Sequence, residues 1–110
     1  MPKYVSFFTY TPEAWKAMIE NPQDRAAHAR SLAESVGGKI ESFYWMSGKF
    51  DGFLIADLPD DQSAAALAVI VKASGALKEY ETHLLTSTEN APALLKKAQA
   101  GAKSYRPPGK

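Results

Sequence analysis

Two segments of this chain are apolar on both sides of an extended strand, and this pattern limits the folds that it can adopt. They are residues 3–10 (KYVSFFTY) and 50–58 (FDGFLIADL). On one side they carry Val5, Phe7, Phe53 and Ile55, and on the other Tyr4, Phe8, Tyr10, Gly52, Leu54 and Ala56. A sheet with one face in water alternates between apolar and polar residues. We therefore expect helices on one face and a second copy's sheet on the other, in a dimer.

The order of the elements predicts the fold. Segments rich in β-branched and aromatic residues predict four strands, at 3–10, 39–46, 50–58 and 77–85. Helical patterns lie between the first two strands and between the last two, and a further helix follows the fourth strand. This βαββαβ order is typical of an α+β, ferredoxin-like fold, with a four-stranded antiparallel sheet and two helices on one face.

Capping residues predict where the helices begin. Thr11 caps the first helical stretch, and the Asn-Pro pair that follows interrupts it, with Asn21 as the cap of a second segment. Asp60 or Asp61 caps the next helix. A proline places the start of the extra C-terminal helix at about Ala91.

Length and charge narrow the class of protein. The 110 residues, 45% of them hydrophobic, are enough for one core but not for two. We assign residues 1–104 to a single domain and 105–110 (YRPPGK) to a flexible or arm-like tail. The net charge of +1, without a basic stripe, argues against a nucleic-acid partner. With no signal peptide and no long apolar run, we expect a cytoplasmic protein without a membrane partner.

Cysteine and histidine chemistry is limited. The chain has no cysteine, which excludes disulfides and thiolate catalysis, and its two histidines are too far apart for a metal motif. No metal site is predicted, and the sequence leaves any cofactor unspecified. His28 lies between Arg25 and Arg30, on a helix face that we expect to be in water.

Several short motifs from residue 48 onwards resemble the GYD domain family. They are Gly48-Lys49-Phe50-Asp51, Pro59-Asp60-Asp61 before an alanine-rich helix, Gly75, and Glu81-Thr82. The resemblance covers residues 3–88 and implies a dimeric α/β barrel, as a homodimer or larger homo-oligomer. Phe50 stands where the family signature has tyrosine, so that phenolic hydroxyl is absent. The resemblance supplies a fold rather than an activity.

Enzymes and haem binders of similar architecture hold their ligand between the sheet and its helices. By that resemblance we predict a ligand-binding set of Tyr10, Trp15, Tyr44 and Trp45, and a catalytic set of His83 and Asp51. The near-neutral pKa of a histidine suits proton transfer, but His83 also fits a hydrogen bond within the sheet or a dimer contact. Trp15 fits the core equally well.

Asp51 has two interpretations. It either orients His83 in the pocket or shapes the hairpin by binding backbone N–H groups. The hairpin turn has either two residues or four, and the four-residue loop pairs Met46 with Asp51. Both registers put Asp51 on the face of Tyr44.

Two functions fit these observations. The first is a small-molecule-binding protein with a partly apolar pocket, which includes a monooxygenase or isomerase with little need of a cofactor. The alternative is a non-catalytic ligand-sensing or assembly module similar to the regulatory domain of Lrp/AsnC regulators, without their helix-turn-helix. Both are analogies based on fold, and neither specifies a ligand.

Overall fold

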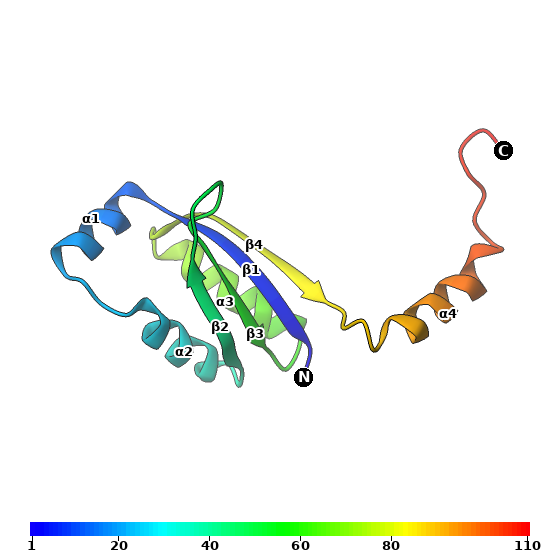
Figure 1. Ribbon diagram of the computed structural model, residues 1–110, viewed down its shortest axis with the longest axis horizontal. Coiled ribbons are helices and arrows are strands. Elements are labelled where there is room, and N and C mark those ends of the chain that lie inside the picture. Colours follow the sequence, from blue (N-terminus) through cyan, green and yellow to red (C-terminus); the bar gives the residue numbers. More distant parts are fainter.

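Four antiparallel strands form one sheet in the order β2-β3-β1-β4 in the computed structural model, which describes residues 1–110 (Figure 1). The strands are β1 (Lys3–Tyr10), β2 (Lys39–Trp45), β3 (Gly52–Asp57) and β4 (Leu77–Leu85). The helices are α1 (Pro12–Glu20), α2 (Arg25–Ser35), α3 (Asp61–Ala73) and α4 (Ala91–Ala102). The ferredoxin-like arrangement with an extra C-terminal helix is therefore confirmed.

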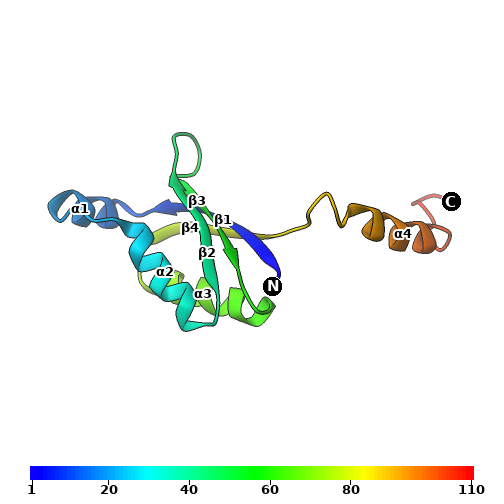
Figure 2. The same ribbon diagram turned by 60° about the horizontal axis from the view of Figure 1, so that its bottom comes forward.

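The register of the strands divides their side chains between two faces of the sheet. Phe7 lies opposite Phe53, and Val5 lies opposite Ile55. The other side of β1 faces α2 and α3, which lie together beneath the sheet (Figure 2). The buried core lies on that side and comprises Tyr4, Ala56, Leu58 and Leu67. Burial of this apolar surface is the main force that holds the helices to the sheet.

Side-chain caps begin three of the helices. Thr11 Oγ1 accepts a hydrogen bond from Ala14 N at 3.2 Å at the start of α1. Asp60 Oδ1 accepts from Ser63 N at 2.8 Å and begins α3. Each cap satisfies one of the backbone donors that a helix leaves unpaired at its N-terminus.

The cap predicted for the second helical segment was wrong. Asp24, not Asn21, begins α2, and its Oδ1 accepts from Ala26 N at 3.0 Å. Asn21 ends α1 in a non-helical conformation, with φ −136° and ψ 78°. A residue that precedes proline avoids the helical conformation, which is why α1 ends at Glu20.

The hairpin between β2 and β3 has the four-residue loop. Met46 N donates to Asp51 O at 2.8 Å, which closes the loop 47–50. The third strand therefore begins at Gly52, two residues later than predicted. A Cβ atom at Gly52 would lie 2.5 Å from Phe8 Cζ, so only glycine lets the Phe8 ring cross the strand there.

No element of the same chain covers the face of the sheet opposite α2 and α3 (Figure 2). We call it the open sheet face, and it carries Val5, Phe7, Phe53, Ile55, Tyr44 and Phe50. The first four of these residues are only half-buried. Two apolar faces were expected from the sequence, and the register shows both.

The C-terminal helix lies apart from the rest of the chain. We call residues 86–110 the arm and residues 1–85 the body; the arm leaves the end of β4 and extends away from the sheet (Figure 1). The radius of gyration is 17.7 Å, against about 13 Å for a compact chain of this length. The sequence predicted the helix but not its separation from the domain. No helix in the structure has the length and hydropathy needed to cross a bilayer.

Candidate functional site

A cavity of about 140 Å³ lies between the helix-covered face of the sheet and helices α2 and α3. Its apolar wall comes from three sides. The sheet contributes Phe8, Phe43 and Leu54, α2 contributes Ala29, Leu32 and Ala33, and α3 contributes Leu67 and Val71. The residues of α2 are spaced by three and four positions, so they fall on one side of the helix. This wall favours an apolar ligand.

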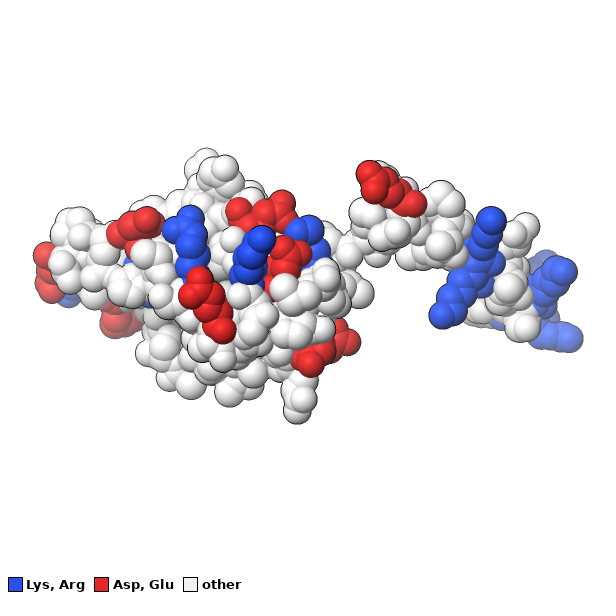
Figure 3. Space-filling model, turned by 90° about the horizontal axis from the view of Figure 1, so that it is seen from below, with Lys and Arg blue, Asp and Glu red and all other residues white.

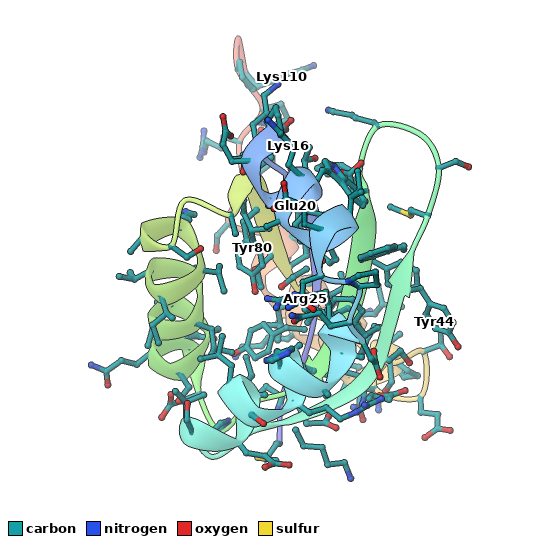
Figure 4. All side chains as sticks on the ribbon, turned by 90° about the vertical axis from the view of Figure 1, so that its left-hand side faces the viewer. Lys16, Glu20, Arg25, Tyr44, Tyr80 and Lys110 are labelled. Atoms are coloured by element: carbon teal, nitrogen blue, oxygen red, sulfur yellow. The ribbon has the colours of Figure 1, made fainter.

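One end of the cavity is polar. Arg25 and His28, on the first two turns of α2, line it together with Tyr10 of β1 and Tyr80 of β4. Figure 4 shows Arg25 and Tyr80 in the space between α2 and α3. The arginine is half-buried, and its side-chain hydrogen bond goes to Gln23 Oε1 at 3.3 Å. It takes part in none of the ion pairs of the structure.

Three of the predicted ligand-binding residues form one aromatic cluster beside the cavity. The ring centre of Tyr10 lies 5.0 Å from that of Trp15 and 5.9 Å from that of Trp45, and the two tryptophans are 5.2 Å apart. Trp45 Nε1 donates to Tyr10 Oη at 3.1 Å. Tyr10 lines the cavity itself, whereas Trp15 and Trp45 pack against Tyr10 and do not line the cavity.

Burial controls the protonation of Tyr10. Loss of water contact raises the pKa of its phenol, against the opposing effects of the Trp45 hydrogen bond and the nearby Arg25. The phenol is therefore neutral near pH 7. Because its oxygen accepts from Trp45, its own hydrogen is available to a ligand.

Tyr44, the fourth predicted ligand-binding residue, lies on the open sheet face. Its ring stacks on Phe53 at 5.6 Å, and it points away from the cavity (Figure 4). The side chain is 61% exposed. The structure therefore does not bring Tyr44 together with Tyr10, Trp15 and Trp45.

Asp51 binds the backbone rather than the cavity. Its Oδ2 accepts from Tyr10 N at 2.9 Å, and its own N donates to Phe8 O at 2.8 Å. The carboxylate thus continues the ladder between β1 and β3 past the point where β3 begins. This geometry matches the turn-shaping interpretation of Asp51.

His83 lies on the open sheet face, opposite Val5 and outside the cavity. Its Nε2 is 2.8 Å from Glu81 Oε2, and its ring lies 6.3 Å from that of Phe7. Asp51 and His83 are on opposite sides of β1, because β1 separates β3 from β4. They also differ by about four residues along β1, or roughly 13 Å. The structure therefore does not form the acid/base couple suggested for them.

Sequence reasoning missed the polar end of the cavity. His28 was expected on a water-exposed face, and it is exposed, as is Arg30, but it also borders the cavity beside the half-buried Arg25. The available signal was their spacing: Arg25, His28, Ala29 and Leu32 share one side of a helix. Tyr80 was also missed. Tyr80 and Thr82 are two residues apart in β4, so they share one side of the strand, and His83 lies on the other.

The sequence model of the GYD domain matches residues 4–95. This match spans most of the chain and includes every strand of the sheet. The chain belongs to the GYD domain family. A search among curated proteins found no match, so the activity has to be inferred from the site itself.

In this GYD domain the signature segment is part of the hairpin rather than of the cavity. Gly48 has a φ of 113°, which the loop needs and which only glycine adopts without strain. The ring of Phe50 lies 5.4 Å from that of Phe7, at the open sheet face. Asp51 then fixes the end of β1. The signature therefore connects the hairpin loop to the central strand.

Proposed function

We propose that this GYD domain is a homodimer that binds a small, partly apolar molecule in the cavity between its sheet and helices α2 and α3. The cavity carries this proposal, because it combines an apolar wall with polar groups at one end. Ligand sites commonly have this composition, in which apolar contacts supply affinity and a few polar groups fix orientation.

The size of the cavity limits the ligand. A volume of about 140 Å³ is close to that of the roughly 150 Å³ apolar cavity that holds benzene in an engineered protein. One aromatic ring or a short branched chain fits. The polar part of such a ligand would lie towards Arg25 and Tyr10.

Ligand sensing fits this site better than acid/base catalysis by the predicted pair. The carboxylate of Asp51 is hydrogen-bonded to the backbone, and His83 lies on the open sheet face, opposite the cavity. The neutral phenol of Tyr10 serves as a hydrogen-bond donor. These observations support a binding or sensing role, and they give the monooxygenase and isomerase hypotheses no proton-transfer couple.

The dimer is proposed from the open sheet face. In water, Phe7, Phe53 and Ile55 would expose a continuous apolar surface, which usually marks an interaction site. Charged groups flank it on both edges: Lys3 bonds to Glu41 and Asp57 on one side, and Glu81 pairs with His83 on the other. An apolar centre with a polar rim is the usual anatomy of an interface.

Filling the cavity should weaken ligand binding. Ala29→Leu adds three carbon atoms to the wall of the cavity, and we expect it to lower the affinity for benzoate, benzamide and phenol at least about tenfold. Fluorescence of Trp15 and Trp45, which lie beside Tyr10, will report the titration.

Ala27→Leu is the matched control, because Ala27 is exposed on the same helix and does not line the cavity. It should bind as the natural chain does. Equal affinity of a folded Ala29→Leu protein for all three probes, or no response of the natural chain, would contradict the cavity as the binding site.

A further inference from the structure

The guanidinium of Arg25 has no acidic partner. It is the cation of the cavity whose positive charge persists at all ordinary pH values. It is half-buried and takes part in no ion pair. The carboxylates in the segments around it are engaged elsewhere: Asp24 with Ala26 N at 3.0 Å and Asp51 with Tyr10 N at 2.9 Å. A partly buried cation of this kind is costly unless an anion joins it.

The neighbours of Arg25 also favour an anion. His28 lies one turn further along α2 at the edge of the cavity, and the Tyr10 hydroxyl hydrogen is free to donate. Arg25 is the first residue of α2, where the helix dipole adds positive potential. Leu32 and Leu67 form apolar wall deeper in the cavity.

We propose that the ligand is a small carboxylate, with its ring or chain against Leu32 and Leu67 and its carboxylate bound by Arg25 and the Tyr10 hydroxyl. Arginine binds carboxylates through two parallel N–H···O bonds, which give direction as well as affinity. This inference rests on the proposed function, because it uses the same cavity.

Two probes of the same shape test whether the cavity prefers a negatively charged ligand. Benzoate and benzamide differ by little except charge, and we expect the natural chain to bind benzoate about tenfold more tightly. Arg25→Gln should bring the affinity for benzoate down to that for benzamide, a loss of about tenfold, because it removes the charge-assisted bonds. Arg30→Gln, an exposed arginine on the same helix, should retain the preference for benzoate.

The outcomes separate this inference from the proposed function. Equal binding of both probes, or an unchanged preference in Arg25→Gln, would overturn the proposal that the ligand is a carboxylate. The cavity would remain the binding site. No binding of either probe would overturn both.

A second inference comes independently from the arm. Ala91, Leu94, Leu95 and Ala98 follow the spacing of one helix face on α4, and the two leucines are 51% and 62% exposed. A helix of 12 residues is marginal in water without packing. The apolar side of α4 therefore needs a surface to cover it.

The outer side of α3 offers a matching surface. Ala65, Val69 and Ala73 follow one another at four-residue spacing, with Ile70 beside them. Val69 and Ile70 are 66% and 46% exposed. A helix that is apolar on nearly all sides is normally buried, so α3 also needs a partner on this side.

Charge favours a second copy of this chain as that partner. The arm carries five of the thirteen basic side chains and one of the twelve acidic ones, so the body is net negative. Figure 3 shows the concentration of basic side chains along the arm. At the start of α3, Asp60 and Asp61 offer negative charge to Lys96 and Lys97.

We infer that α4 docks by its leucine face on the outer side of α3 in a second copy. Since the chain has no cysteine, single cysteines can be introduced without background. Under mild oxidation, a Leu94→Cys chain mixed with a Val69→Cys chain should give a cross-linked product of about twice 12.0 kDa. A Lys49→Cys chain, at the tip of the hairpin, should cross-link to Leu94→Cys at least about tenfold less.

Two results would overturn the docking of the arm. The first is a Leu94→Cys/Val69→Cys double variant that oxidises only within one chain. The second is co-sedimentation of the natural chain with phosphatidylserine vesicles together with no cross-link, which would assign the basic helix to a lipid surface. We infer this docking as a contact within the sheet-to-sheet dimer, so Ile55→Lys should weaken the Leu94→Cys/Val69→Cys cross-link as well.

Discussion

We expect Ile55→Lys to convert the proposed homodimer to a monomer. Ile55 lies on the open sheet face, opposite Val5 of β1 and Ser42 of β2. In a two-fold interface every substitution occurs twice. If each buried lysine costs about 2 kcal/mol, the dissociation constant rises roughly a thousandfold.

The same change outside the interface is the control. Ile19 is 75% exposed on α1, away from the sheet, and Ile19→Lys should leave the dimer intact. Light scattering coupled to size exclusion should give about twice 12.0 kDa for the natural chain and for Ile19→Lys, and about 12.0 kDa for Ile55→Lys. A natural chain that is monomeric, or a dimer that tolerates Ile55→Lys, would contradict the sheet-to-sheet dimer.

Asp51→Ala is expected to lower the free energy of unfolding by about 2 kcal/mol, because it leaves a backbone donor without a partner. That donor is Tyr10 N, at the end of the central strand, and Asp51 Oδ2 accepts its hydrogen at 2.9 Å. Asp51→Asn keeps an acceptor oxygen in place, so it should recover most of the loss.

Urea denaturation of the natural chain and the two variants measures both effects. A loss below about 0.5 kcal/mol in Asp51→Ala, within the range of ordinary surface substitutions, would show that the carboxylate does not shape the fold. Equal losses in the alanine and asparagine variants would show that the charge of Asp51, rather than its oxygen, matters.

Local chemistry made much of the fold predictable. The strands β1 and β4 have the predicted bounds, because β-branched and aromatic residues fill them and turn signals end them. Thr11 and Asp60 begin α1 and α3 as expected. The error at Asn21 arose because Asn21-Pro22 has the same cap-and-proline pattern as Thr11-Pro12, which does begin α1, whereas Asn21 ends α1 and Asp24 begins α2.

The site was less predictable because sequence does not reveal which face of a strand meets the helices. A β-bulge in β2, between Ile40 and Ser42, also reverses the alternation part-way along the strand. As a result Trp45 lies on the side of the helices and Tyr44 does not. No local pattern marks such a bulge.

The position of the arm depends on a surface formed by residues that are distant from it in the sequence. The spacing of Leu94 and Leu95 predicts an amphipathic helix, and α4 forms as expected. What covers that helix depends on the exposed side of α3 in another copy, as we infer. A single sequence contains both surfaces without showing that they meet.

The most direct test of the cavity is a heteronuclear NMR titration of the ¹⁵N-labelled chain with benzoate. Binding in the cavity predicts saturable shifts of the amides of Arg25, Leu32, Leu77 and Tyr80, with little change in the strand positions beside Ile55. Shifts confined to the open sheet face, or no saturable shift at any amide, would contradict a ligand site between the sheet and helices α2 and α3.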